Sequence, residues 1–209
     1  MNRFTELVPR GKVIPVVTIN DSEDAAHIAR ALFDGGIQVI EVALRTDAAL
    51  DAIRRITQEV PDMLVGAGTI KHPADVQPAV TSGAAFLVSP GTTMDLLTEV
   101  RRWDIPFLPA ASSPTESLTL LSAGYDCQKL FPADVLGGFD YLNAIRGPIP
   151  EVTFCPSGGV NAENYCALLA LSNVYCVSGS WITPADCLEQ RDWRTIKDIA
   201  LGVSAASDS

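Results

Sequence analysis

The sequence has 209 residues, of which 47% are hydrophobic, and it carries a formal net charge of −10. A chain of this length can bury one sizeable core but is short for two, so we expect residues 1–209 to form a single domain. Nucleic acids and anionic membranes bind basic surfaces, so the acidic balance argues against both as partners. An anionic substrate would need positive charge that is placed locally.

Short apolar runs alternate with helix-like segments along the whole chain. The runs expected to form strands are residues 13–19, 39–44, 64–70, 86–90, 106–111, 127–133, 151–159 and 174–181. Eight strands that alternate with helices favour an α/β fold of the (β/α)8 TIM barrel type, because eight near-equal units fit the closure of a ring. A doubly wound open sheet is the alternative.

Capping residues predict where several connecting helices begin. Asp21 or Ser22 would cap the first helix, and Thr46 would cap the second. Ser113, followed directly by a proline, would cap a later helix. Residues 192–206 would form the last helix.

The second apolar run and the residue after it place an acidic and a basic side chain on one face of the expected strand. Active sites of TIM barrels lie at the carboxyl ends of the strands, so residues at these ends matter most. Side chains of a strand alternate between its faces, so Glu41 and Arg45 would both point into the barrel mouth. The alternative is a buried ion pair that only stabilises the fold.

Lys129 is the one lysine of four that lies within an apolar strand. Burial disfavours the ammonium form, and a free amine can attack a carbonyl to form a Schiff base. A carboxylate such as Glu41 suits the proton transfers, and an arginine such as Arg45 binds the carboxylate of a 2-oxo acid. Thr69 adds a hydroxyl at another strand end. The alternative is a lysine that reaches solvent or only pairs with an acid.

Glycine-containing turns follow the last two strands. Ser157, Gly158 and Gly159 open the helix that follows the seventh strand, and Ser178, Gly179 and Ser180 close the eighth strand. These two loops form the usual phosphate site of TIM barrels, and glycine lets the backbone approach a ligand closely. The sequence therefore predicts a phosphorylated substrate.

Neither the histidines nor the cysteines have the spacing of metal ligands. His27 falls within a helix and His72 within a loop, and the five cysteines are widely separated. We therefore expect no metal and no cofactor. Unpaired cysteines, and an amino terminus without a hydrophobic signal segment, predict a cytoplasmic protein.

Several motifs together resemble one enzyme family. They are GGIQVIEVALRT, VGAGTI, SPG, KLFPAD, FCPSGGVNAENY and SGSW. The sequence is similar, over nearly its whole length, to the 2-keto-3-deoxy-6-phosphogluconate (KDPG) aldolases, also called 4-hydroxy-2-oxoglutarate (KHG) aldolases. The resemblance implies a homotrimer that cleaves KDPG to pyruvate and glyceraldehyde 3-phosphate, with side activity on KHG.

The resemblance also implies residue roles. Lys129 would be the Schiff-base lysine and Glu41 the acid/base residue. Four further residues would surround pyruvate: Arg45 and Thr69 at its carboxylate, and Pro90 and Phe131 as walls.

Two positions depart from the family pattern. Ser157 stands where a threonine is common, and Ser178 stands where a glycine is common. The change at Ser157 could alter substrate tolerance, so an aldolase for the galactonate epimer of KDPG is an alternative. Ser178 could add a hydroxyl near the phosphate or crowd it. A phosphate-binding isomerase or epimerase, or a non-catalytic binding protein, would have no need of Lys129 together with Glu41.

Overall fold

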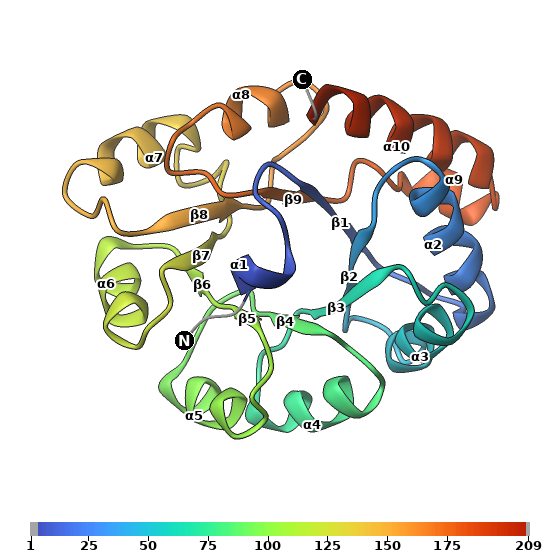
Figure 1. Ribbon diagram of the computed structural model, residues 1–209, viewed down its shortest axis with the longest axis horizontal. Helices are drawn as coiled ribbons and strands as arrows, with labels where there is room; N and C mark the ends of the chain where they lie inside the picture. The colour runs from blue at the N-terminus through green and yellow to red at the C-terminus, as the bar shows by residue number, and fades with distance from the viewer. Residues whose placement is uncertain (1–3, 208–209) are drawn as a thin grey trace.

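The computed structural model describes residues 4–207 as a ring of parallel strands surrounded by helices (Figure 1). The strands are β1 (Val13–Val17), β2 (Val39–Ala43), β3 (Leu64–Gly68), β4 (Phe86–Val88), β5 (Phe107–Leu108), β6 (Ala110–Ala111), β7 (Cys127–Leu130), β8 (Thr153–Pro156) and β9 (Val177–Gly179). Every apolar run that was predicted to form a strand contains one, so those predictions are confirmed.

The strands close into a barrel. Hydrogen bonds order them as β5-β4-β3-β2-β1-β9 and as β6-β7-β8. β5 and β6 are two halves of one barrel strand, interrupted at Pro109, which has no N–H group to donate. Parallel bridges from Phe154 to Val174 and from Ser157 to Ser178 join the remaining edges. Within residues 4–207 this gives eight barrel strands, so the prediction of a (β/α)8 barrel is confirmed and the open sheet is excluded.

Helices follow the strands and cover the outside of the ring (Figure 1). They are η1 (Ser22–Asp24), α2 (Ala25–Asp34), α3 (Ala49–Glu59), α4 (Pro73–Thr81), α5 (Met94–Arg102), α6 (Pro114–Ser122), α7 (Phe139–Arg146), α8 (Tyr165–Leu169), α9 (Ala185–Glu189) and α10 (Trp193–Ser207). Asp21 and Ser113 cap η1 and α6 as predicted, each by accepting a hydrogen bond from a backbone N–H.

The prediction that Thr46 caps the second helix is wrong. α3 begins at Ala49, and its first residues have no side-chain cap. The Thr46 hydroxyl donates instead to the carbonyl oxygen of Ile19, in the segment that follows β1. The hydroxyl that the local pattern assigned to the helix therefore forms its hydrogen bond with a distant part of the chain.

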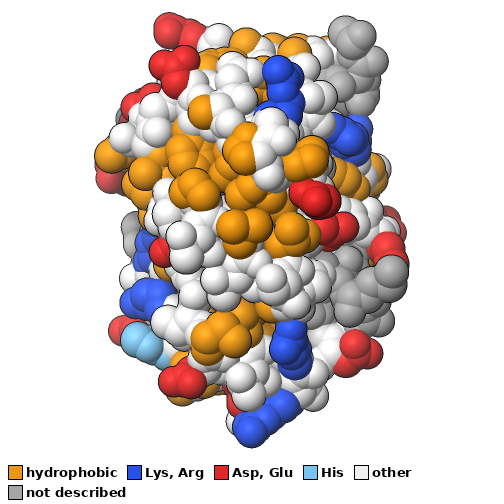
Figure 2. Space-filling model, turned by 90° about the vertical axis from the view of Figure 1, so that its left-hand side faces the viewer, with side chains coloured by type: hydrophobic (Ala, Val, Ile, Leu, Met, Phe, Trp, Pro, Cys, Tyr) orange, Lys and Arg blue, Asp and Glu red, His pale blue; other side chains and the backbone are white. Residues whose placement is uncertain are grey.

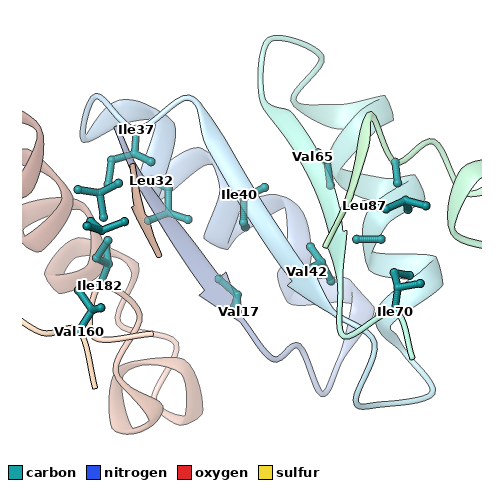
Figure 3. Close-up of a cluster of buried hydrophobic side chains, with 14 of the residues drawn as sticks. Val17, Leu32, Ile37, Ile40, Val42, Val65, Ile70, Leu87, Val160 and Ile182 are labelled. Carbon is teal, nitrogen blue, oxygen red and sulfur yellow. The ribbon is translucent and has the colours of Figure 1, made fainter. Parts of the chain in front are cut away.

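The side chains of each strand divide between two apolar layers. Ile40 and Val42 of β2 pack outward against the helices, together with Leu32 of α2 (Figure 3). Glu41, which lies between them, therefore points into the barrel. The interior layer contains mainly aliphatic and aromatic residues with three cysteines: Ile14, Val39, Phe86, Val88, Leu108, Cys127, Cys155 and Cys176.

A short helix that the sequence did not predict, α1 (Phe4–Leu7), closes the amino end of the barrel. It lies across the centre of the ring in Figure 1. The ring of Phe4 is fully buried, and its centroid lies 5.6 Å from that of Phe86. The Tyr175 hydroxyl lies 2.9 Å from the carbonyl oxygens of Thr5 and Val8, and these hydrogen bonds hold the segment in place. The open mouth is therefore at the carboxyl ends of the strands.

No helix in the described part of the chain has both the length and the apolar character that crossing a membrane requires.

Candidate active site

A buried ion pair lies at the centre of the barrel. The Nζ atom of Lys129 on β7 is 3.3 Å from Oε1 of Glu41 on β2, and the two side chains are only 7% and 2% exposed. Period two along each strand points both side chains inward, as the sequence predicted. An isolated charge in this position would be costly, so each group needs the opposite charge of the other beside it. A proton can pass between them without reaching bulk water.

Two thiols lie near Lys129. Cys155 on β8 pairs with Lys129 in the register of β7 and β8, and Cys176, which directly precedes β9, is close enough for the Lys129 charge to act on it. A hydrogen bond with Cys155, together with burial, raises the pKa of Cys176 well above its ordinary value. This thiol therefore stays neutral and adds no charge near the lysine.

Arg45 and Thr69 meet at the rim of the mouth. The Arg45 Nε atom donates to the Thr69 hydroxyl at 3.3 Å, although 24 residues separate them. They follow the neighbouring strands β2 and β3, whose carboxyl ends lie side by side. The guanidinium group is exposed, so it is available to a ligand carboxylate.

The loop after β8 is shaped by two glycines in the left-handed region. Gly158 and Gly159 have φ values of +84° and +86°. A Cβ atom on Gly159 would also lie 2.1 Å from the Cβ atom of Asp134. Residues with side chains rarely adopt this φ and could not fit there, so glycine is required at this position. The exposed backbone can therefore approach an anion closely.

These groups line one cavity of about 310 Å³. Ten of the twelve residues predicted for the site are among its walls: Arg45, Thr69, Pro90, Lys129, Phe131, Ser157, Gly158, Gly159, Gly179 and Ser180. The Lys129 Nζ atom lies 5.7 Å from the centroid of the Phe131 ring. Glu41 is buried behind the lysine.

Ser178 does not line this cavity. It is fully buried, and its hydroxyl has no hydrogen-bond partner among the described residues. By period two it points inward, as does Cys176 directly before β9, whereas Gly179 faces outward against Trp181. The hydroxyl predicted to lie near a phosphate therefore sits inside the barrel instead.

Two hydroxyls, on Ser89 and Thr92, hold the loop around Pro90 in place. The hydroxyls of Ser89 and Thr92 are 3.0 Å apart, and both accept from the backbone N–H of Ala110. Thr92 also donates to the Ala110 carbonyl oxygen. These bonds replace ladder contacts at the break in the fifth barrel strand. They fix the loop in which Pro90 forms a wall of the cavity.

The sequence reading missed Gly68 and two apolar wall residues. A Cβ atom at Gly68 would lie 2.1 Å from Glu41 Oε1, so glycine leaves the space that the carboxylate occupies. Val16 and Val160 line the cavity. Val16 could have been found from period two along the first strand, but no local signal marks Gly68.

The two histidines lie outside the cavity. His27 is exposed on α2 and stacks on Trp193 at 6.0 Å, and His72 directly precedes α4. Within residues 4–207, no three His, Cys, Asp or Glu side chains are grouped as metal ligands.

The sequence is similar to those of known aldolases. The sequence model of the family described as KDPG and KHG aldolase matches residues 5–199. A 2-dehydro-3-deoxy-phosphogluconate aldolase of Pseudoalteromonas atlantica is 43% identical over 195 residues, which cover 93% of this chain and 91% of the relative. A KHG/KDPG aldolase of Escherichia coli K12 is 42% identical over 194 residues, with the same two coverages.

Two solved structures are similar over nearly the whole chain. A KDPG aldolase from Legionella pneumophila, with pyruvate captured as a covalent carbinolamine intermediate, has a TM-score of 0.90 and 44% identity, and the match covers 92% of this chain and 93% of that one. A KDPG aldolase from Zymomonas mobilis ZM4, with 3-phosphoglycerate, has a TM-score of 0.92 and 37% identity, with coverages of 98% and 97%.

The burial of the ion pair makes a prediction about stability. Replacing Glu41 alone by leucine leaves the Lys129 charge buried without a partner, so the free energy of unfolding should fall by about 3–5 kcal/mol. The double variant Glu41→Leu/Lys129→Met removes both charges and should regain most of this loss. Urea unfolding followed by circular dichroism measures both values.

The exposed pair of Lys197 and Asp34, at 3.3 Å, provides the control. Lys197→Met should change the free energy of unfolding by no more than about 1 kcal/mol. If Glu41→Leu proved no more destabilising than Lys197→Met, or if the double variant were no more stable than Glu41→Leu, the pair would not be a mutually dependent buried pair.

Proposed function

This chain belongs to the KDPG and KHG aldolase family, and on that premise we propose that it is a class I aldolase that cleaves KDPG to pyruvate and glyceraldehyde 3-phosphate. The observation that carries the proposal is the buried Lys129 amine, which opens onto the cavity and lies 3.3 Å from a carboxylate. An isomerase or a simple binding protein on this fold would have no use for such a lysine.

Lys129 is the nucleophile of the proposed reaction. Its amine attacks the C2 carbonyl of the substrate to give a carbinolamine, which loses water to form an iminium ion. The iminium ion accepts the electron pair of the C3–C4 bond when that bond breaks. The aldehyde leaves, and pyruvate remains on the lysine as an enamine until protonation at C3 and hydrolysis release it.

Glu41 moves the protons of this sequence. Its Oε1 atom is placed to take the proton from the Lys129 ammonium group, which makes the amine nucleophilic. Its second oxygen is also buried and has no hydrogen-bond partner among the described residues, so no other protein group holds it. Because Gly68 has no side chain, this carboxylate has room to stay beside the lysine.

The two ends of the cavity hold the two ends of the substrate. Arg45 and Thr69 bind the carboxylate, Pro90 and Phe131 flank the pyruvate part, and Ser157 lies beside them on the loop after β8. The phosphate binds to backbone N–H groups at Gly158 and Gly159, and to Gly179 and Ser180 at the carboxyl end of β9. Ser178 would act on the phosphate only indirectly, because it is buried below this loop.

We also propose that the whole chain, residues 1–209, forms one barrel domain, that it assembles as a homotrimer and that it acts in the cytoplasm. Hydrophobic side chains gather on the side of the barrel that carries α6 and α7 (Figure 2), where Leu118 is 49% exposed. Such a surface suits self-association. The five cysteines of the chain form no disulfide, as is usual in a reducing compartment.

Sedimentation tests the trimer. The measured molecular mass should be three times the 22.3 kDa of one chain, and a monomeric species would contradict the trimer.

A substrate panel tests the function. The purified protein should release pyruvate from KDPG with a kcat/KM at least about tenfold above the values for the galactonate epimer and for KHG, because only KDPG satisfies both ends of the cavity with the right stereochemistry. Pyruvate release, coupled to lactate dehydrogenase, gives the three values. The rate on KDPG should be unchanged by EDTA. A preference for the epimer would assign the other aldolase, and loss of activity in EDTA would contradict Schiff-base catalysis.

Trapping with borohydride tests the residue roles. Pyruvate and borohydride should label Lys129, and mass spectrometry of peptides locates the adduct. Glu41→Gln should still form the adduct but turn over KDPG at least about 100-fold more slowly, because it cannot move protons.

Asp134→Asn is the matched control, since Asp134 is an exposed carboxylate near the same mouth that does not line the cavity. It should keep wild-type turnover. Labelling of another lysine would remove Lys129 from its role, and normal turnover in Glu41→Gln would remove Glu41.

A further inference from the structure

A second cavity adjoins the catalytic one and is about three times larger. Its volume is about 950 Å³, against about 310 Å³. Val16, Arg45 and Ser180 line both cavities, so the two meet at the barrel mouth. From there the larger cavity, here called the side cleft, runs between the segment after β1 and the segment that leads from β9 into α9. The reaction proposed above uses only the smaller cavity.

The walls of the side cleft combine apolar surface with uncharged polar groups. Thr18 and Asn20 come from the segment after β1, and Trp181 and Leu188 supply apolar surface from the opposite side. Thr183, also in the wall, is 4% exposed, and its hydroxyl has no partner among the described residues. A wall with C–H surface and unused hydrogen-bonding groups suits a polyhydroxylated carbon chain.

The charges of the side cleft disfavour an anion at its far end. Its charged wall residues are three carboxylates and two guanidinium groups: Asp21, Asp24, Glu189, Arg45 and Arg191. Arg191 already forms ion pairs with two of these carboxylates: its Nη2 atom is 3.2 Å from Asp21 Oδ2, and its Nε atom is 2.9 Å from Asp24 Oδ1. Arg45 lies at the shared end, next to Thr69. A ligand that extends away from the catalytic cavity therefore meets excess negative charge.

The ion pairs of Arg191 also tie the two walls together. Asp21 and Asp24 belong to the segment that enters α2, whereas Arg191 follows α9. These contacts link parts of the chain that are 170 residues apart. The side cleft is therefore a shaped space between connected walls.

From these features we propose that the side cleft is a second aldehyde subsite, separate from the phosphate loops that hold glyceraldehyde 3-phosphate, and that it accepts uncharged polyhydroxylated aldehydes longer than three carbons. The inference rests on the proposed function, because Lys129 must form the imine. In the cleavage direction the C4 hydroxyl loses its proton and becomes the aldehyde, while the electrons of the C3–C4 bond pass to the Lys129 enamine. Protonation at C3 and addition of water then release pyruvate, so no further reactant is needed.

The test varies the length of the substrate's carbon chain and keeps the substrate's charge the same. The substrates are two unphosphorylated 2-oxo-3-deoxy sugar acids, one with six carbons and one with eight, and KDPG serves as the reference. The eight-carbon acid places two more hydroxylated carbons in the side cleft. Its kcat/KM should exceed that of the six-carbon acid by about tenfold. Equal values, or a preference for the shorter acid, would overturn the inference.

A pair of tryptophan variants on α9 locates the effect. Ala185 is exposed and lines the side cleft, whereas its neighbour Asp186 is exposed and does not. Ala185→Trp fills the cleft and should abolish the preference for the eight-carbon acid, while Asp186→Trp should retain it. An unchanged preference in Ala185→Trp would overturn the assignment of the subsite. Cleavage of KDPG separates the two proposals: if KDPG is cleaved and the preference is absent, only the subsite fails, and if KDPG is not cleaved, the proposed function fails.

Discussion

The ion pair between Lys129 and Glu41 is the constraint on which the rest of the site depends. Two charges held 3.3 Å apart inside a barrel are tolerated only while both are present and well placed. The barrel meets this need by bringing β2 and β7 to opposite parts of one ring and by leaving space at Gly68 for the carboxylate. The neutral thiol of Cys176 adds no competing charge. The same closeness that stabilises the pair lets a proton cross between its members.

The fold also explains how an acidic protein can bind an anionic substrate. The net charge is −10, yet the charged residues that line the catalytic cavity are Arg45 and Lys129, which are both cationic. Backbone N–H groups of the glycine loops add positive potential without adding a charged side chain. Attraction is therefore local, as the composition required. The side cleft, with its carboxylates, has the opposite character, so the two cavities favour different ends of a ligand.

Much of this arrangement could be predicted from sequence because it follows from periodicity. Alternation along single strands places Glu41 and Lys129 inside, and eight repeated units indicate a closed barrel. Thr46 and Ser178 could not be assigned in this way. The Thr46 hydroxyl binds Ile19, 27 residues away, and Ser178 lies within β9, where the barrel encloses its side chain, and not in a loop at the mouth. Gly68 matters only because a side chain from the neighbouring strand crosses above it. Such roles depend on distances between strands, which local patterns do not contain.

The most direct test of the central claim is hydrogen exchange at the methyl group of pyruvate. A lysine that forms an imine, next to a carboxylate that moves protons at C3, should replace the methyl hydrogens with deuterium in deuterium oxide. Proton NMR measures the loss of the methyl signal. The account predicts exchange by the wild-type protein and none above background by Lys129→Met. A wild-type protein that cleaves KDPG but leaves the methyl group of pyruvate unexchanged would contradict it.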